Sequence, residues 1–246
     1  MAVRNIKLTI CYDGSKYHGW QIQPGQRTIQ GELTEAIQNL TGCKVQIFGA
    51  SRTDAGVSAL GQVALMQIDS PIPTENIAGA ITHRLPPDIV VTEAVEVPDG
   101  FDVIGAVKSK LYRYTIFNGP VRPVLQIRHC WHLPAELDTT AMAEAAKALI
   151  GEKDFKSFAS AADKRESSVR TIFRCDVTRE DNWIYIDVEG DGFLYNMVRN
   201  IVGTLVEVGL GRWAAEKIKQ ILEAKDRTAA GPIAPAAGLC LMWIKY

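Results

Sequence analysis

Apolar residues in the first part of the chain gather in short runs that predict alternating strands and helices. Runs rich in apolar and β-branched residues predict strands, and apolar residues that recur every three or four positions predict helices. Glycines, prolines and a capping threonine separate the runs. The predicted strands are 5–12, 44–49, 62–68 and 89–97, and the predicted helices are 28–42 and 73–85. Their order, βαββαβ, is the ferredoxin-like arrangement.

The rest of the chain repeats this theme with longer insertions. The predicted strands are 111–117, 128–133, 169–178, 183–189 and 239–246, and the predicted helices are 138–150, 194–205 and 213–224. In the second of these helices, Tyr195 and Arg199 are expected to share a face away from the apolar one. We predict an α+β chain of two domains, 1–105 and 106–246, joined near 98–108, with a ligand site in a cleft between their sheets.

Composition narrows the range of partners. The 246 residues are 47% hydrophobic, which is enough to supply a core for each of two domains. The formal net charge of −1 gives no overall attraction to nucleic acid or to a membrane, so a polyanion would have to meet a local cluster of cations. The five cysteines are isolated in sequence, which predicts a reduced, cytoplasmic protein. We expect no secretion signal, and the most apolar helical run, 201–210, is far shorter than the roughly 20 residues that span a bilayer.

A carboxylate in a short turn is the best candidate for chemistry. The segment 51–59 joins two predicted strands, and within it Asp54 follows Arg52 by two residues and precedes Gly56 by two. Judged by local sequence alone, Asp and Gly between strands are ordinary turn residues. An aspartate that faces a cleft can also act as a base, a metal ligand or a nucleophile. Arg52 and Arg199 are the candidate cations that would keep it ionised, and the alternative for both is an ordinary surface ion pair.

Other classes of active site lack their sequence signatures. The one spaced histidine pair, His129 and His132, lies in a predicted strand, where a separation of three places the side chains on opposite faces. We therefore predict no metal site. The sequence contains no nucleophile elbow, P-loop or dinucleotide-binding fingerprint. The remaining chemical roles for Asp54 are those of a base or a nucleophile.

Basic residues gather in two groups in the second half of the chain. In the first group, Lys108, Lys110 and Arg113 interleave with Tyr112 and Tyr114. Cations beside aromatic rings suit a phosphate backbone with an unstacked base, and stacking contributes about 1–3 kcal/mol per base. The alternative is a solvated strand face for the first group and a polar loop for the second. The second group comprises Lys153, Lys156, Lys164, Arg165, Arg170 and Arg174.

Six ordered blocks of residues resemble the tRNA pseudouridine synthase A family. The signature Arg-Thr-Asp-Ala-Gly-Val at 52–57 and the central element Lys-x-Tyr-Arg-Tyr at 110–114 are the most specific. The resemblance covers nearly the whole chain, and the blocks follow the family's order. The other blocks are Tyr12, Gly14, Gly19-Trp20-Gln21 and Gln23; Gly151, Asp154-Phe155, Ser157-Phe158 and Val169 to Ile172; Gly192 to Leu194, Met197 to Arg199 and Gly203; and Ala230 to Pro232, Ala234-Pro235, Gly238-Leu239 and Leu241.

This resemblance implies an isomerase that acts on RNA. The family converts uridines at positions 38 to 40 of the tRNA anticodon arm to pseudouridine, without a metal or a cofactor. The resemblance implies that Asp54 is the essential carboxylate, that Arg199 pairs with it, and that Arg52 holds it or helps to displace the base. Tyr112 is expected to stack on the target base and to act in proton transfer, with Leu239 covering the opposite face. Attack at ribose C1′, elimination at the sugar and attack at C6 of the base all stay open.

The resemblance also implies an architecture and partners. It implies the pseudouridine synthase fold, in which two RNP-like halves join their antiparallel sheets around a central cleft, and a homodimer that contacts tRNA with both subunits. Ser58 stands where the family usually has His, and Val103, Ile104 and Gly105 stand near the place of its usual Arg-aromatic pair. Contacts to RNA are expected from Lys110, Arg113, Lys164, Arg165 and Arg170.

Two other functions are compatible with the same residues. A tRNA-binding module without catalytic activity would use Asp54 only as a turn residue, although the full set of Asp54, Tyr112 and Arg199 favours an enzyme. A nucleic-acid N-glycosidase would release free uracil. Such hydrolysis commonly uses a second carboxylate to activate water, and no obvious partner lies near Asp54 in the sequence.

Overall fold

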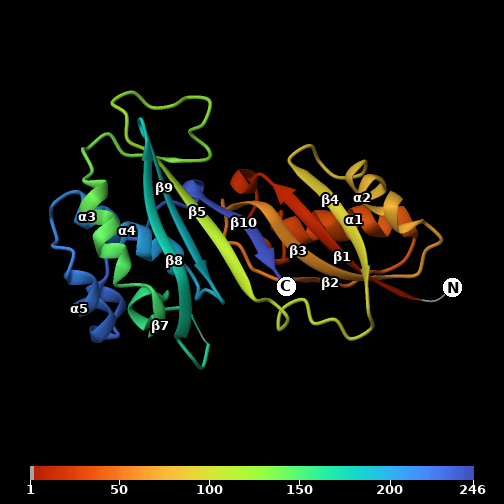
Figure 1. Cartoon of the computed structure of the whole chain (residues 1–246). Helices are drawn as coiled ribbons and strands as arrows, with labels where there is room; N and C mark the ends of the chain where they lie inside the picture. The colour runs from red at the N-terminus through yellow and green to blue at the C-terminus, as the bar shows by residue number, and fades with distance from the viewer. Residues whose placement is uncertain (1–2, 164) are drawn as a thin grey trace. The chain divides into compact units, whose positions relative to one another are not determined.

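The computed structural model describes residues 3–163 and 165–246 and divides into two compact units (Figure 1). The first unit contains Met1–Lys108 and Leu241–Tyr246, and the second contains Ser109–Cys240. The end of the chain therefore belongs to the first unit. Strands and helices are mixed in both units, which confirms the predicted α+β class. The predicted limits of the two domains stay a prediction.

The first unit has the predicted βαββαβ order. Its elements are β1 (Arg4–Tyr12), α1 (Ile29–Thr41), β2 (Ile47–Gly49), β3 (Ser58–Ile68), α2 (Thr74–Thr82) and β4 (Ile89–Val97), together with the part of β10 (Leu239–Lys245) from Leu241 onward. The strand order is β4-β1-β3-β10, and the short β2 also pairs with β3. Strand β1 is antiparallel to both β3 and β4, as in a ferredoxin-like sheet.

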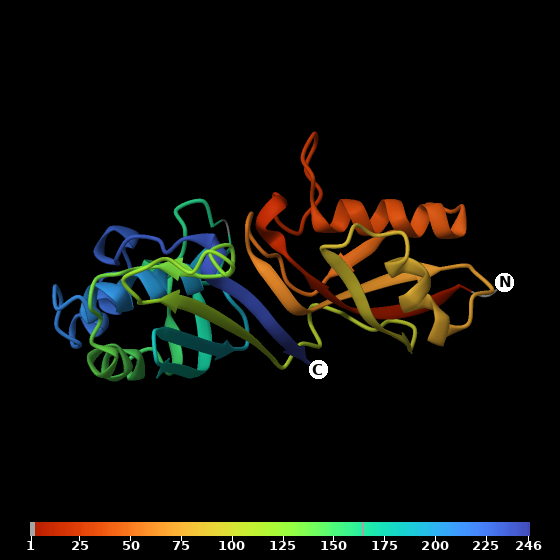
Figure 2. The same ribbon diagram turned by 90° about the horizontal axis from the view of Figure 1, so that it is seen from above.

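The limits of α1 follow from residues at its two ends. The Thr28 side chain accepts a hydrogen bond from the Gly31 backbone N–H at the start, and Gly42 takes a φ of 70° at the end. Ile29 and Leu33, one helical turn apart, are both fully buried. Figure 2 shows α1 lying along one face of the first unit's sheet, so this apolar stripe faces the core.

A second, smaller apolar cluster forms in the first unit around the segment that was predicted to join the domains. Val63 and Val103 are buried at its centre, and Phe101 and Tyr246 pack against them. The Tyr246 hydroxyl donates a hydrogen bond to the Val103 carbonyl at 2.8 Å. The predicted joining segment, 98–108, is therefore packed into the first unit. Val103, which lies near the place of the family's usual Arg-aromatic pair, is therefore an apolar core residue.

The second unit is a sheet with helices on one face. Its elements are β5 (Ser109–Phe117), β6 (Trp131–His132), α3 (Thr139–Lys147), β7 (Gly151–Asp154), β8 (Val169–Glu180), β9 (Trp183–Gly190), α4 (Met197–Gly209) and α5 (Lys217–Ala224). The strand order is β5-β9-β8-β7, and β6 pairs with β5 in parallel. Figure 1 shows α3 and α4 on the same side of these strands, and α3 packs against β8.

Several limits predicted for the second unit were wrong. The strand predicted at 128–133 is only β6, because a turn closed by a hydrogen bond from His129 to Gln126 precedes it. The segment between the predicted helix 138–150 and the predicted strand 169–178 begins with a strand, β7, whose sequence Gly-Glu-Lys-Asp has no apolar residue to reveal it. The last helix begins at Lys217, four residues later than predicted.

Candidate functional site

Asp54 opens a tight turn between β2 and β3, as the sequence predicted. The Asp54 carbonyl accepts a hydrogen bond from the Val57 N–H at 3.1 Å. Gly56, the third residue of the turn, has a φ of 79°. A residue with a side chain would adopt this backbone conformation only at a cost in free energy. Val57 is buried, Asp54 is partly buried and Arg52 is exposed. The turn thus fixes the backbone on the carboxyl side of Asp54 and leaves part of its surface accessible.

Buried polar side chains fix the other side of the turn. The hydroxyls of Tyr12 and Thr53 are 2.8 Å apart, and both residues are buried. Gln62, on β3, donates a hydrogen bond from Nε2 to the Ser51 carbonyl at 2.7 Å and a longer one to the Tyr12 hydroxyl at 3.4 Å. Sequence reasoning included Tyr12 in a motif but missed Gln62, because a single glutamine in a strand carries no signal of its own.

The amino-terminal motif packs directly against the signature turn. The Trp20 N–H donates to the Thr53 carbonyl at 3.0 Å. A Cβ at Gly19 would lie 2.6 Å from that carbonyl oxygen, and one at Gly14 would lie 2.0 Å from the Val57 carbonyl oxygen. Both glycines are therefore needed for close contact between backbones. The spacing of the motif reflects this packing.

Ser58 links the same two segments. Its Oγ accepts a hydrogen bond from the Gly14 N–H at 3.1 Å, where the loop after β1 begins. Asp13 caps the short 3₁₀ helix Gly14–Lys16 through the Ser15 N–H. The serine that departs from the family's usual histidine thus braces the signature turn against the amino-terminal motif.

In the second unit, Tyr112 and Lys110 share a face of β5. Tyr112 is buried, and its ring meets the edge of Phe193 with the ring centroids 5.2 Å apart. Burial, together with the charges of Arg165 and Arg170, lowers the pKa of Lys110 to about 8. The structure therefore brings three of the predicted RNA-binding cations within electrostatic reach of one another.

Arg113 points to the other face of β5, as alternation along a strand requires. Its Nε and one terminal nitrogen donate to the two carboxylate oxygens of Asp187, both at 2.7 Å, and its guanidinium lies 5.0 Å from the centre of the Tyr185 ring. For the group that contains Arg113 the sequence left open a solvated strand face, and the structure shows Arg113 paired with Asp187 on β9. A contact between Arg113 and RNA stays a prediction.

Arg199 lies in the first turn of α4, where the loop that follows α5 holds it. Its Nε donates to the Ala234 carbonyl at 2.8 Å, and the Ala234 N–H donates to the Arg199 carbonyl at 3.2 Å. A Cβ at Gly203 would lie 1.7 Å from the Pro232 carbonyl oxygen, so only glycine allows this loop to approach α4. Leu239, which follows the same loop, is buried. The carboxyl-terminal motif thus serves to position Arg199.

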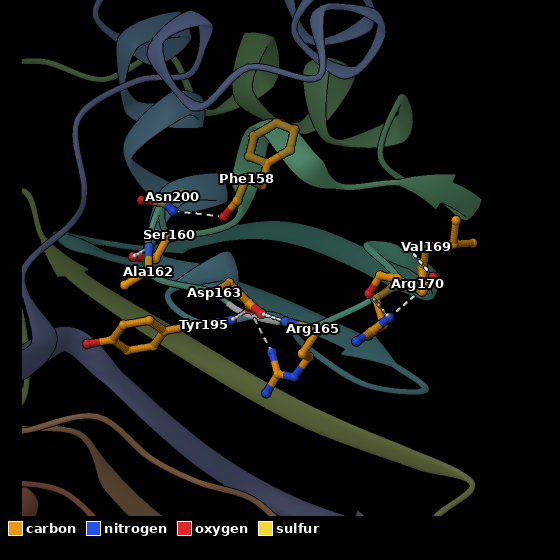
Figure 3. Close-up of polar contacts among 10 residues, drawn as sticks. Phe158, Ser160, Ala162, Asp163, Arg165, Val169, Arg170, Tyr195 and Asn200 are labelled. Carbon is orange, nitrogen blue, oxygen red and sulfur yellow. Dashed lines mark hydrogen bonds and ion pairs between the residues drawn. The ribbon is translucent and has the colours of Figure 1, made fainter.

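The loop before β8 contains Arg165, a member of the second basic group, and is held by one carboxylate (Figure 3). One oxygen of Asp163 accepts hydrogen bonds from the Tyr195 N–H at 2.7 Å and from the Arg165 side chain at 2.9 Å, and the other accepts from the Arg165 N–H. Burial raises the pKa of Asp163, but the two backbone hydrogen bonds and the charges of Arg165 and Arg170 together outweigh it and hold the pKa below its usual range. Tyr195 lies before α4, which begins at Met197. The prediction that Tyr195 shares a helix face with Arg199 was therefore wrong.

Arg170 and Lys164 are the remaining cations that the sequence predicted to bind RNA in this region. Arg170 donates to the carbonyls of Ser167 and Val169, and burial followed by the charge of Arg165 lowers its pKa. Lys164 lies outside the described residues. Asp54 and Arg52 belong to the first unit. The other predicted site residues belong to the second unit.

Other kinds of site find little support in the described part of the chain. No group of three His, Cys, Asp or Glu side chains there is placed to hold a metal, and no helix there could cross a membrane. All five cysteines are described, and none is in a disulfide. A cavity of about 650 Å³ beside α3 and α4 is lined by Leu137, Val208 and Trp213 and contains none of the predicted site residues.

A braced carboxylate in one unit and clustered cations in the other are features of an enzyme that acts on nucleic acid. The chain belongs to the tRNA pseudouridine synthase family, whose sequence profile matches residues 9–104 and 145–246. This family consists of isomerases that act on tRNA, and its fold is the pseudouridine synthase fold.

Curated relatives match this chain from end to end. The tRNA pseudouridine synthase A of Acetivibrio thermocellus is 46% identical over 244 residues, which are 99% of this chain and 100% of that protein. The tRNA pseudouridine synthase A of Caldicellulosiruptor saccharolyticus is 44% identical over the same shares of the two chains. These relatives confirm the resemblance that the sequence blocks indicated.

Proposed function

We propose that this chain isomerises uridines to pseudouridine at positions 38 to 40 of the tRNA anticodon arm, with Asp54 as the nucleophile. The observation that carries the proposal is the Asp54 turn, in which backbone and buried side-chain hydrogen bonds hold the segments on both sides of the carboxylate. A reacting group must be held closely to its productive position, and this turn provides such support. The names of the relatives support tRNA as the substrate.

The reaction rearranges one nucleotide and needs no other reactant. The bond between N1 of uracil and ribose C1′ breaks, the base turns, and a bond forms between C5 and C1′. The proton lost from C5 is balanced by the proton gained at N1. A carboxylate can form a covalent adduct at C1′ or at C6 of the base, or can act as a base in elimination at the sugar. All three routes require Asp54 to be ionised at the start.

The other site residues supply charge and stacking in this proposal. Arg199 and Arg52 keep Asp54 ionised, because a nearby cation favours the charged form of a carboxyl group. Tyr112 and Leu239 cover the two faces of the target base. These contacts offset the unstacking of a flipped nucleotide, which costs a few kcal/mol. The edge contact between Tyr112 and Phe193 supports this role, because it limits the rotation of the Tyr112 ring.

Basic residues of the second unit hold the tRNA backbone in this proposal. Lys110, Arg165 and Arg170 interact electrostatically with one another, which suits binding of a phosphate group. Arg113, on the other face of β5, and Lys164 are further proposed contacts to RNA. We place the enzyme in the cytoplasm, in keeping with cysteines that form no disulfide.

The active form is proposed to be a homodimer. The chain has a net charge of −1, so two copies that act on one tRNA would double a modest number of local cations. The loop between β5 and β6 exposes Val121, Val124 and Leu125 at 77%, 73% and 88%, and apolar surface of this kind is a candidate contact between copies. Changing Leu125 to Asp is expected to shift the protein toward monomer in sedimentation velocity.

The position of the modification tests the proposal. A tRNA transcript without pseudouridine is incubated with pure protein, and pseudouridine is mapped by reaction with carbodiimide and primer extension. We expect modification within positions 38 to 40, and none when the uridines at those positions are replaced by cytidine. Modification elsewhere in the transcript would contradict the proposed specificity. If the protein binds tRNA but forms no pseudouridine, it would instead be a tRNA-binding module without catalytic activity.

A further inference from the structure

Gln62 is a fully buried polar residue on β3 that the proposed chemistry does not yet use. Its exposed fraction is 0%, and its partner across the sheet is Ile10, which is also fully buried. Its position therefore belongs to the face of the sheet where Ile10, Leu8 and Ile6 form the core. A buried amide is unfavourable unless its donors and acceptor are bonded, so its retention there requires partners.

Two of those partners, Ser51 and Tyr12, connect Gln62 to the signature turn. Nε2 donates to the Ser51 carbonyl at 2.7 Å and to the Tyr12 hydroxyl at 3.4 Å, while Oε1 accepts from the Val63 N–H at 3.1 Å. Because the Tyr12 oxygen accepts from Gln62, its own proton is available for Thr53 Oγ1, 2.8 Å away. One amide thus reaches Ser51 directly and Thr53 through Tyr12.

We infer that Gln62 is a positioning residue for Asp54, which sets the approach of the catalytic carboxylate without touching the substrate. The inference rests on the proposed function. Gln62 and Tyr12 hold residues 51 and 53 by their carbonyl and hydroxyl groups, and the Trp20 N–H holds the Thr53 carbonyl. Residues 51 to 53 lead directly into Asp54, so a shift in them moves the carboxylate.

The first variant removes the amide and keeps most of the volume. Gln62→Leu is expected to lower the single-turnover rate at saturating tRNA by about 10- to 100-fold, the range that a displacement of about 1 Å produces. The dissociation constant for tRNA is expected to change by less than about twofold, because no RNA-binding group is altered. Circular dichroism and thermal melting establish how much of the protein is folded.

A matched control exists on the same strand. Gln67 is exposed near the other end of β3, and its side chain donates to the Asn5 Oδ1 at 3.1 Å. Gln67→Leu removes a side-chain hydrogen bond from β3 but leaves the signature turn intact. Its rate is expected to stay within about twofold of wild type.

A second variant tests the donor itself and guards against misfolding. Gln62→Glu keeps the shape, and burial raises the pKa of the carboxyl group that it introduces. The neutral carboxyl has one O–H that can donate to the Ser51 carbonyl, whereas the carboxylate has none. The rate of Gln62→Glu per folded molecule, divided by the rate of wild type, is therefore expected to rise as the pH is lowered from 8 to 6. Thermal melting at both pH values separates this change from the loss of folded protein that an ionised buried carboxyl group would cause.

The outcomes separate this inference from the proposed function. If wild-type protein forms pseudouridine while folded Gln62→Leu keeps a rate within twofold of it, the inference is wrong and the function stands. A loss confined to tRNA affinity, or a Gln62→Glu ratio that does not vary with pH, would also overturn it. If Gln62→Leu does not fold, the pH dependence of Gln62→Glu decides whether the inference holds. If wild-type protein forms no pseudouridine, the proposed function is what fails.

Discussion

The turn that carries Asp54 and the loop that carries Arg165 are held in opposite ways. The turn is fixed by buried groups, since Tyr12, Thr53 and Gln62 are each less than 10% exposed and bond to one another or to the turn backbone. The described residues of the loop are largely exposed. The loop is tied to Tyr195, two residues before α4, through the carboxylate of Asp163 and a backbone hydrogen bond from Ser160.

This difference matches what each region is proposed to do. Bond formation requires reacting atoms about 3–3.5 Å apart and correctly aligned, so a catalytic carboxylate benefits from rigid support. Charge attraction to phosphate depends weakly on geometry, and flexible cations can follow a curved RNA backbone. Variants in the turn should therefore change the rate, and variants in the loop should change the affinity.

The largest effect is expected from Asp54→Asn. The substitution keeps the size of the side chain and removes the reacting carboxylate, so the rate should fall by about 10⁴-fold, as for other essential carboxylates. Binding of tRNA should stay within about tenfold, because little volume or charge changes. Single-turnover assays and filter binding measure the two quantities. A large loss of affinity with a normal rate would reverse the roles assigned to the two regions.

The next largest effect is expected from Gly19→Ala. The added Cβ would lie 2.6 Å from the Thr53 carbonyl oxygen, and the residue would have to keep a φ of 87°. We expect a loss of about 1–3 kcal/mol in the free energy of unfolding, together with a slower reaction. Gly25→Ala is the matched control, because its φ is 71° but its Cβ would meet no described atom within 4 Å. Equal effects of both variants would mean that φ alone matters and that packing on the turn does not.

A smaller effect on affinity is expected from Asp163→Ala. The variant removes the carboxylate that ties the loop to Tyr195, so tRNA should bind about 3- to 10-fold more weakly while the rate at saturation is unchanged. The low pKa of Asp163 means that this tie is present at neutral pH and is lost only as the pH falls through the folded-state value. Tighter binding by Asp163→Ala would instead show that its negative charge opposes RNA and that loop order matters less.

The smallest effect is expected in the salt dependence of binding. If Arg165 and Arg170 each meet one phosphate, replacing either by Ala should reduce the slope of log K against log salt by about 0.7–0.9. Arg212→Ala is the control, since Arg212 is exposed and paired with Glu207. Unchanged slopes for Arg165→Ala and Arg170→Ala would make this region an ordinary solvated loop.

The sequence predicted the parts of the fold that depend on repeating apolar patterns and on caps. The limits of α1 and the βαββαβ order are examples. It failed where the pattern is broken by a buried polar group or by backbone geometry. Gln62 was missed because a polar residue in a strand is assumed to face solvent, and Tyr195 was misplaced because Asn196, with a φ of 61°, delays the start of α4.

The candidate site was predicted by resemblance more than by local pattern. Asp54 alone looked like a turn residue, and it is one. The turn and the chemistry are compatible, because a tight turn with buried supports is a means of fixing a carboxylate. Ser58 shows the limit of resemblance, since its hydrogen bond with the Gly14 N–H could be found only from the structure.

The fate of the target base tests the central claim most directly. A transcript labelled in its uracil rings is incubated with the pure protein, without added metal, and the label is followed in RNA and in free base, with Asp54→Asn as the blank. We predict that the label stays in the RNA and moves from uridine to pseudouridine with wild-type protein only. Release of labelled uracil, or pseudouridine formed equally well by Asp54→Asn, would contradict an isomerisation carried out by this carboxylate.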